Sequence, residues 1–442
     1  MPLRIGIVGA GVSGLVAAAE MHRAGHEVTV FEAGSHVGGH AHTHTLEAEG
    51  TTWEVDTGFI VMNDRNYPNF ERILAELGVE TQETSMSFGV SDENGDFEWS
   101  ARGLGGVFAQ RSNITDPRFL RMLADVPRFN RKARELLGVR GHGPSLRAFL
   151  EDNNFSKYFV DRLLIPQAAS IWSADPEQMW TFPAAFLAEF FENHGTLQVR
   201  RRPQWRTVIG GSATYVRDLT NPFADRIWIN TPVESIERGP DAVTIRHPGG
   251  VSEFDQVVIA THSDQALEML SEPTEAERQV LGAIPYQQNE TVLHTDTSIM
   301  PRRRAAWASW NFHVLDQSEP CRTTLTYDMN SLQRLGAETN FLVTLNRTDA
   351  IDPAKIIKTV AYDHPVFSNE GLHAQERWAE ISGADRIHYC GAYWRWGFHE
   401  DGCWSGLRVS EALGGRGPGL DGSAPASIGD SPSSLDRVLE PA

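Results

Sequence analysis

The apolar and polar positions at the start of the chain follow three patterns in turn. The apolar run Arg4–Val8 predicts a buried strand, and it ends at a glycine-rich segment, Gly9–Gly14. Apolar positions from about Leu15 to Arg23 have helical spacing, and Glu27–Glu32 alternates like a second strand. This order predicts a strand, a tight turn, a helix and a parallel strand, the opening of an α/β fold.

Each glycine of the turn has a separate physical role. Gly9 allows the tight turn, Gly11 lets a diphosphate approach the backbone, and Gly14 lets helix and strand pack closely. The helix N-terminus offers free N–H groups and a dipole that favour an anion. Glu32 follows Gly14 by 18 residues, near the usual spacing of an acid that binds ribose hydroxyls. The segment therefore predicts dinucleotide binding.

Later patterns predict two insertions of different kinds. Residues 64–204 are expected to be mostly helical, because Asn69–Leu77 has helical apolar spacing and Asp116-Pro117 is typical of a helix start. Residues 266–383 contain strand-like runs, which predict an antiparallel sheet. The runs are Thr291–Thr295, Ala306–Val314, Thr323–Tyr327 and Phe341–Leu345.

Composition narrows the class of protein. The 442 residues suffice for two to three domains, and the net charge of −19 argues against nucleic-acid binding. Net charge alone also gives no attraction to anionic lipid. Cys321, Cys390 and Cys403 lie far apart, so neither a disulfide framework nor a cysteine zinc site is expected, and a reduced cytoplasm fits best. No secretory signal and no apolar run of membrane-spanning length is visible.

Four further segments occur in a characteristic order. They are Gly38-Gly39 with Val55–Phe59, Trp205–Ser212, Arg386–Tyr393, and Gly402–Arg408. With the opening unit they resemble the flavin amine oxidase superfamily, which includes phytoene desaturases and protoporphyrinogen oxidases. The resemblance extends from Leu3 to about Leu413. One departure is His40, which stands where the superfamily usually has an arginine after the glycine pair.

The resemblance implies an α/β fold with a Rossmann-like FAD-binding domain and an α+β substrate domain. The FAD domain is expected at 1–63, 205–265 and 384–413, and the substrate domain at 64–204 and 266–383. Residues 414–442, rich in Gly, Ser and Pro, are predicted to be a disordered tail. The implied cofactor is non-covalent FAD, and the expected contacts are Gly9, Gly11, Val12, Ser13, Gly14, Glu32, Ala33, Gly38, Gly39, His40, Thr57, Gly58, Val233, Gly391, Gly402 and Ser405.

A narrower resemblance rests on Asp56–Val61, Pro301–Trp310 and Gly397–Gly402. These phrases are similar to predicted FAD oxidoreductases that accompany cyclopropane-fatty-acid-synthase-like methyltransferases, and to a desaturase-like protein of furan fatty acid synthesis. The resemblance implies an apolar, lipid-like small-molecule substrate. It leaves open a methyltransferase partner and a transient contact with a membrane surface.

The candidate catalytic residues follow Gly391. Tyr393 and Trp396 are expected to form aromatic walls of a substrate slot, against the alternative of core packing. His399 could move protons, or belong to a helix-capping network. Cys403 does not match the position of a covalent flavin link, so we expect it to pack in the core.

One cluster of histidines and one of arginines can each be interpreted in two ways. His40, His42 and His44 alternate and could bind zinc, although cofactor or packing contacts are favoured and no metal is predicted. Arg302, Arg303 and Arg304 either bind an acidic head group or form a solvated turn.

The four lysines, Lys132, Lys157, Lys355 and Lys358, bear on the reaction. Many amine oxidases hold a lysine near the flavin, and none of these matches its position. The leading hypothesis is therefore an FAD-dependent oxidoreductase that desaturates, oxidises or isomerises a lipid-like substrate. A flavin amine oxidase and a non-catalytic flavoprotein partner of a lipid-modifying enzyme are the alternatives. An NAD-dependent dehydrogenase is opposed by the Gly38-Gly39 pair, and a second nucleotide fingerprint for NAD(P)H is absent.

Overall fold

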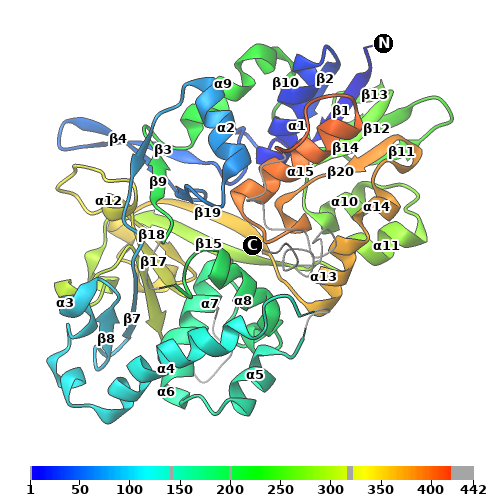
Figure 1. The fold of residues 1–442 in the computed structure, drawn as a ribbon. Coiled ribbons are helices and arrows are strands. Elements are labelled where there is room, and N and C mark those ends of the chain that lie inside the picture. The colour runs from blue at the N-terminus through cyan, green and yellow to red at the C-terminus, as the bar shows by residue number, and fades with distance from the viewer. Residues whose placement is uncertain (1, 140–142, 199–201, 316–321, 420–442) are drawn as a thin grey trace, which may run out of the picture.

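A five-stranded parallel sheet organises the upper part of the molecule (Figure 1). The computed structural model describes residues 2–139, 143–198, 202–315 and 322–419. The strand order is β10-β2-β1-β14-β20. Three distant stretches of chain therefore meet in one sheet, whose strands are β1 (Arg4–Val8), β2 (Glu27–Phe31), β10 (Ile227–Trp228), β14 (Gln256–Ile259) and β20 (Ile387–Tyr389).

Helices α1 (Val12–Arg23) and α15 (His399–Ala412) pack against each other beside this sheet. Two glycines of α15 allow the close approach: a Cβ on Gly402 would meet the Val12 side chain at 2.5 Å, and one on Gly406 would collide with the Ser13 carbonyl. The first helix begins at Val12, three residues before the predicted start. The end of the glycine-rich segment already adopts helical geometry, with Gly11 as the N-cap.

A seven-stranded sheet forms the second layer, with the order β19-β15-β18-β17-β16-β7-β8. Neighbouring strands are antiparallel except β16 and β7, which run parallel. The strands are β7 (Phe88–Asp92), β8 (Glu98–Ser100), β15 (Tyr286–His294), β16 (Trp310–Val314), β17 (Leu325–Asp328), β18 (Leu342–Leu345) and β19 (Ile356–Pro365).

The sequence analysis did not anticipate two features of this sheet. The predicted run Ala306–Val314 begins at the last residue of a short helix, Arg304–Ala306, and the strand itself begins only at Trp310. The stretch 64–204 is mostly helical, as predicted, but it also contributes β7 and β8, which extend the sheet built from 286–365. Val90 on β7 is buried where that strand pairs with β16, opposite Phe312, and local periodicity does not report a pairing between such distant segments.

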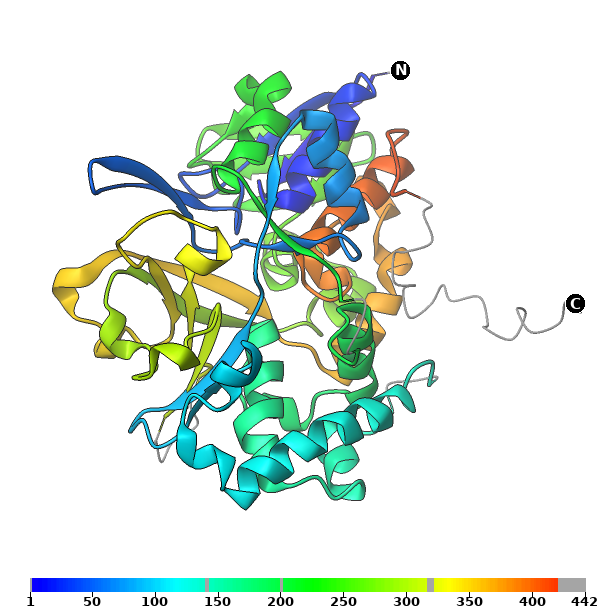
Figure 2. The same cartoon turned by 60° about the vertical axis from the view of Figure 1, so that its left-hand side comes forward.

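Below the two sheets lies a helical layer rich in aromatic side chains (Figure 2). Asp116 caps α4 as its side chain accepts a hydrogen bond from the Arg118 N–H. The helices of this layer are α4 (Pro117–Arg134), α5 (Leu146–Asp152), α6 (Lys157–Phe159), α7 (Ile165–Trp172) and α8 (Ala184–Asn193).

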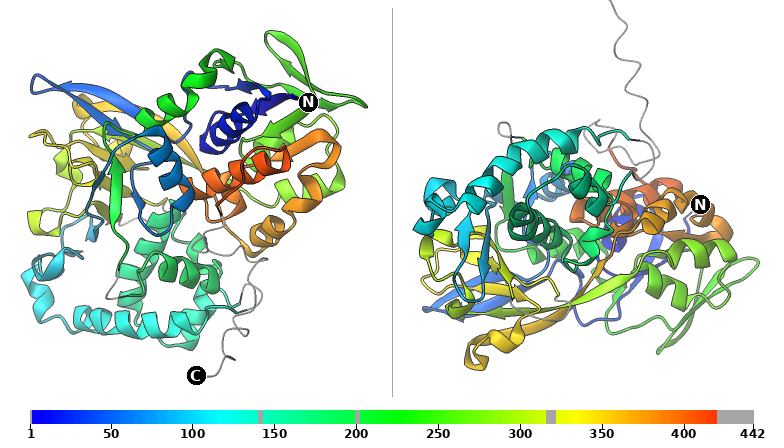
Figure 3. Two further views of the ribbon diagram at one scale, coloured as in Figure 1. Left: turned by 45° about the horizontal axis from the view of Figure 1, so that its top comes forward. Right: turned by 90° about the horizontal axis from the view of Figure 1, so that it is seen from below.

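The remaining elements connect or cover these layers, as the two views of Figure 3 show. The strands are β3 (Thr43–Ala48), β4 (Thr51–Asp56), β5 (Met62–Asn63), β6 (Thr81–Glu83), β9 (Trp205–Val208), β11 (Ser235–Arg238), β12 (Val243–His247) and β13 (Gly250–Phe254). The helices are α2 (Pro68–Leu77), α3 (Gly103–Val107), α9 (Ala213–Thr220), α10 (Ser263–Met269), α11 (Glu275–Leu281), α12 (Met329–Leu332), α13 (Asn369–Glu376) and α14 (Trp378–Ile381).

The first residues of the predicted disordered tail contact the rest of the protein. Residues 414–419 are described, and Arg416 pairs with Glu76 at 2.5 Å and with buried Glu20 at 2.8 Å. Residues 420–442 of the predicted tail lie outside the described residues. Within the described ranges, no helix is both long and apolar enough to cross a membrane.

Candidate active site

The glycine-rich turn forms a cradle of backbone at the C-terminal end of β1. Gly9 has φ +104°, and a Cβ there would lie 2.9 Å from the Ala260 carbonyl oxygen, so only glycine fits. A Cβ on Gly14 would collide with the Gly9 carbonyl. At Gly11, by contrast, a Cβ would meet nothing within 4 Å, because that residue faces a cavity. The turn is therefore held by its neighbours and leaves one position free for a ligand.

Glu32 connects this cradle to the next loop. One carboxylate oxygen accepts the Ala10 N–H at 2.8 Å, and the other accepts the Gly34 N–H at 2.7 Å. The Gly38 N–H donates to the Ala10 carbonyl at 2.8 Å. Each carboxylate oxygen retains a lone pair for a further donor, so Glu32 can organise the loop and still bind hydroxyl groups.

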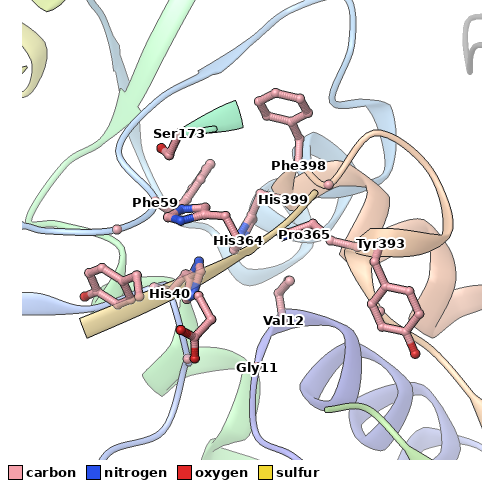
Figure 4. A pocket seen from close by; sticks show the side chains of 18 of the residues that line it. Gly11, Val12, His40, Phe59, Ser173, His364, Pro365, Tyr393, Phe398 and His399 are labelled. Carbon is pink, nitrogen blue, oxygen red and sulfur yellow. The ribbon is translucent and has the colours of Figure 1, made fainter. Parts of the chain in front are cut away.

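A cavity of about 960 Å³ extends from Glu32 past the cradle and into the space between the sheets and the helical layer. Ligand pockets usually measure about 300–1,000 Å³, so this volume is at the upper end of that range. Figure 4 shows the start of α1, marked by Gly11 and Val12, on one side of the cavity, with His40, Phe59 and His364 beside it. A glycine-lined anion site, a ribose-binding acid and a long cavity are the features that a flavin dinucleotide requires.

Most of the predicted contact residues line this cavity. They are Gly9, Gly11, Val12, Ser13, Glu32, Ala33, Gly38, Gly39, His40, Thr57, Gly58, Val233 and Gly391, together with the predicted catalytic residues Tyr393 and His399. Their role in binding a cofactor stays a prediction.

Three predicted contact residues, Gly14, Gly402 and Ser405, lie behind the cavity wall and do not line it. Gly14 and Gly402 are the close-packing positions of α1 and α15 described above. Ser405 accepts a hydrogen bond from the Gly391 N–H at 3.1 Å and so supports a residue that does line the cavity. These three positions shape the site through helix packing.

Trp396 does not line the large cavity, which corrects the prediction that it forms a wall of the slot. Its ring lies in the core of the helical layer, 6.2 Å from the rings of Phe186 and Phe190. Its carbonyl oxygen accepts a hydrogen bond from Trp172 Nε1 at 3.1 Å. The turn before α15 is irregular, with Gly397 at φ +87°, and Trp396 packs in the core of the helical layer, whereas Tyr393 packs with residues of β14 and β20.

His399 lines the cavity but is held by three aromatic neighbours. Its ring stacks on Phe59 at 3.8 Å and lies edge-to-face with Phe70. Its Nε2 atom lies 2.8 Å from the Tyr215 hydroxyl. Burial lowers the pKa of His399 to about 3, so the ring is neutral at pH 7. This environment favours a packing and hydrogen-bonding role over proton transfer.

His364 on β19 is a cavity residue that the sequence analysis missed. Asn289 donates to its Nδ1 at 2.9 Å, and the Asn289 oxygen is itself bound by the Asn346 amide at 2.7 Å. This arrangement fixes the amide orientation, so Nδ1 is an acceptor and the proton resides on Nε2. Burial lowers the pKa of His364 to about 4. The ring is a neutral donor in the wall of the cavity.

Two further histidines line the cavity and were also missed by the sequence analysis. His194 and His262 line the cavity from the helical layer and from the segment after β14. Burial lowers the pKa of His194 to about 4, and that of His262 below its ordinary value. The three histidines missed here are isolated in the sequence, so no motif indicated them.

The alternating histidines belong to β3 and the loop before it. His36 and His42 stack at 3.9 Å, and His44 bonds to the Thr57 hydroxyl at 3.1 Å. Burial, assisted by the neighbouring imidazoles, lowers the pKa of His42 to about 4. Among the described residues, no cluster of His, Cys, Asp or Glu has a geometry that could hold a metal ion.

The arginine run lies away from the cavity. Arg303 pairs with buried Glu98 at 2.9 Å, and the Arg304 guanidinium lies over the Trp307 ring. None of the four lysines lines the cavity. Cys403 is buried in the core around α1, and burial raises the pKa of its thiol well above the ordinary value.

Comparison with known proteins identifies the class that this fold and site define. Residues 12–306 match the family "Flavin containing amine oxidoreductase", so the chain belongs to that family. Its members are FAD-dependent oxidoreductases, and the predicted family, fold class and cofactor are thereby confirmed.

Among curated proteins, the chain is 27% identical to the L-amino-acid oxidase of Mus musculus over 316 residues, which is 64% of this chain and 46% of that protein. It is 40% identical to the 4,4'-diapophytoene desaturase of Staphylococcus aureus over 62 residues, 14% of this chain and 12% of that protein. The chain spans about half the length of the first of these relatives.

Two solved structures show the same fold. One is wild-type putrescine oxidase bound to putrescine, with 16% identity, a TM-score of 0.64, and coverage of 93% of this chain and 99% of that chain. The other is the CLA-producing fatty acid isomerase from P. acnes, with 18% identity, a TM-score of 0.65, and coverage of 93% and 97%.

Proposed function

We propose that this protein uses non-covalently bound FAD to desaturate, oxidise or isomerise a carbon–carbon bond of a fatty-acyl substrate. The observation that carries the proposal is the character of the chamber, by which we mean the part of the cavity lined by residues from 86–101, 167–198, 202–205, 310–315 and 322–345. When bound, the flavin supplies a hydride acceptor. The chain itself supplies the shape and the polarity of the chamber.

Apolar and aromatic side chains dominate the chamber wall. Ile171, Trp172 and Phe190 come from the helical layer, and Trp310, Tyr327 and Leu345 come from the seven-stranded sheet. A flexible acyl chain has few polar handles, so such walls must orient it by contact and exclude water from the reacting carbons. The lining supports a lipid-like substrate.

Charge distinguishes this reading from the amine oxidase alternative. Among the chamber-lining residues that the structure describes, Arg202 is the only Asp, Glu, Lys or Arg, and its side chain is exposed. A cationic amine would find no carboxylate there, whereas an acyl carboxylate at the rim would meet a guanidinium. The named relatives include an amino-acid oxidase, so the amine reading is kept as the second candidate.

Neutral histidines are compatible with a redox site that acts on an uncharged carbon–carbon bond. His364 brings a hydrogen-bond donor to the cavity without a positive charge. His40 lies beside it, with ring centroids 5.3 Å apart, and burial holds the pKa of His40 well below its ordinary value. A bound molecule therefore meets these polar contacts in the cavity beside the chamber and mainly apolar walls within the chamber.

Anaerobic flavin reduction tests the proposal. The purified yellow protein is mixed with fatty acids, phospholipids or a panel of amines, and the visible absorbance is followed. Bleaching by an acyl compound, or conversion of that compound without net bleaching in the case of isomerisation, is the expected result. Bleaching by amines alone, with peroxide release in air, would establish the amine oxidase reading. Flavin that no compound reduces, with no acyl conversion, would favour the non-catalytic partner of a lipid-modifying enzyme.

A further inference from the structure

A positively charged stretch stands out in this acidic protein. Residues 102–134, which we call the basic ridge, contain eight Lys or Arg and two Asp, a net charge of +6 in a chain that totals −19. The ridge comprises α3, the short helix Arg111–Ile114 and α4. These segments follow one edge of the molecule in Figure 1 and lie along the outside of the helical layer in Figure 2.

The same ridge exposes large apolar side chains. Leu104 is 78% exposed, Ile114 is 53% exposed and Leu120 is 45% exposed. With Val139, just beyond α4, they make up four of the nine large apolar side chains that are exposed among the described residues. Single exposed apolar residues are common, but several within one basic segment indicate an interaction surface.

Helix α4 has buried side chains on one face and exposed side chains on the opposite face. Phe119, Met122 and Phe129 are buried against the helical layer. Leu120, Ala124, Pro127 and Arg131 follow at intervals of four, three and four residues, which places them along one outward stripe. The stripe from Leu120 to Arg131 covers 11 residue steps (131 − 120) and is therefore about 17 Å long, so it can lie flat on a planar partner.

Local acids neutralise only part of the ridge. Asp116 pairs with Arg118, and buried Asp125 pairs with both Arg121 and Arg128. Arg111 and Arg131 are exposed and contact no carboxylate among the described residues. Those two guanidinium groups keep their positive charge available for an external anion.

Both ends of the ridge adjoin the cavity. Ala101, which lines the cavity and is itself exposed, directly precedes the ridge. At the other end, Arg134 donates to the Leu197 carbonyl at 2.5 Å and pairs with Glu192, and the lining residues 194–196 lie between those two contacts. A molecule on the ridge would thus be close to the chamber.

We propose that the basic ridge docks this protein on the surface of an anionic phospholipid bilayer. Arginine side chains bind lipid phosphates, and exposed Leu104, Ile114 and Leu120 enter the boundary between head groups and acyl chains. An acidic protein partner would satisfy the arginines but would not by itself require the apolar side chains. The proposal extends the proposed function by placing the chamber next to a lipid source, and its test does not depend on catalysis.

Vesicle flotation without substrate is the experiment. The intact flavoprotein is mixed with vesicles of phosphatidylcholine alone, or of equal parts phosphatidylcholine and phosphatidylglycerol, at low and at high salt. We expect binding to the anionic vesicles that weakens with salt. Arg111→Glu/Arg131→Glu should reduce this binding about tenfold or more, and Leu104→Ser/Leu120→Ser should reduce it without changing its salt dependence.

The matched control is Arg226→Glu/Arg278→Glu, which makes the same charge change on exposed residues far from the ridge. Equal loss of binding in control and ridge variants would overturn the proposal, as would equal binding to neutral and anionic vesicles. Absence of vesicle binding, with salt-sensitive binding to polyglutamate, would replace the bilayer by an acidic protein partner. Vesicle binding without acyl chemistry would leave the ridge intact and reject only the proposed function.

Discussion

The cradle around the start of α1 and the chamber beyond it are two halves of one cavity built by different means. The cradle consists of backbone from consecutive residues, Gly9 to Ser13, and is joined to Glu32 through the Ala10 N–H. The chamber consists of side chains from segments more than 200 residues apart, such as Met86 and Trp310. No residue of the cradle wall between Gly9 and Ser13 presents a large side chain, whereas large side chains such as Phe88, Trp172 and Phe190 line much of the chamber.

This contrast separates the binding of a cofactor from the choice of a substrate. A backbone cradle tolerates no change at its tight positions but says little about the reaction. A chamber of side chains can be altered residue by residue, so its lining decides which molecule fits. The following predictions test whether the two halves are as independent as their construction indicates.

The largest effect is expected in the cradle, where two glycines should respond differently. Gly14→Ala forces a Cβ into the Gly9 carbonyl and should destabilise the fold by about 3 kcal/mol or more, because overpacked backbone cannot relax. Gly11→Ala meets no protein atom and should leave apo-protein stability within about 0.5 kcal/mol, while its methyl group hinders FAD. Urea unfolding of the apo-proteins and flavin absorbance measure the two effects. Equal unfolding midpoints would show that Gly14 is not a packing position.

Glu32→Ala should weaken FAD binding more than it affects folding. A charge-assisted hydrogen bond contributes about 1.5–3 kcal/mol, or roughly ten- to over a hundredfold in affinity. Titration of apo-protein with FAD gives the affinity, and Glu32→Gln serves as the control that keeps the shape without the charge. Wild-type affinity in the alanine variant would remove Glu32 from the binding site.

Acid should destabilise the sheet of the chamber through buried His313. Burial lowers its pKa to about 3, and its ring nitrogens contact Ser91 and Thr326. The unfolded chain takes up a proton near pH 6.5 and the folded chain does not, so stability is complete above pH 6.5 and falls as the pH drops toward 3. At pH 5 this loss amounts to about 2 kcal/mol. His313→Gln should show a smaller drop in Tm between pH 7 and pH 5, and an identical drop would exclude the effect.

The smallest effect concerns the rim of the chamber. Arg202→Ala should raise KM for a free fatty acid about tenfold, near 1.4 kcal/mol, because a carboxylate loses its guanidinium partner. The methyl ester of the same acid is the internal control, and its KM should not change. A parallel rise for acid and ester would mean that Arg202 shapes the rim without binding the carboxylate.

The sequence predicted more of the cradle than of the rest of the cavity. In the cradle, the glycine spacing and Glu32 predicted both the local structure and the residues that line the cavity, although Gly14 proved to be a packing position. Beyond the cradle, the sequence indicated the cavity residue Tyr393 but misplaced Trp396. An irregular turn connects the two, and a turn without periodicity gives no indication of which way a side chain points.

The sequence by itself determined the cofactor class, since each element of the cradle depends on a local constraint: a positive φ, a close backbone contact, or the free N–H groups of a helix start. The sequence also contained the segments that resemble the family, in the family's order. Only the tertiary structure decided the chamber. His194, His262 and His364 line the same cavity from three separate elements, and the basic ridge adjoins the cavity at both ends. Such positions depend on packing between distant segments, and the local sequence around each of them is that of an ordinary helix, strand or loop.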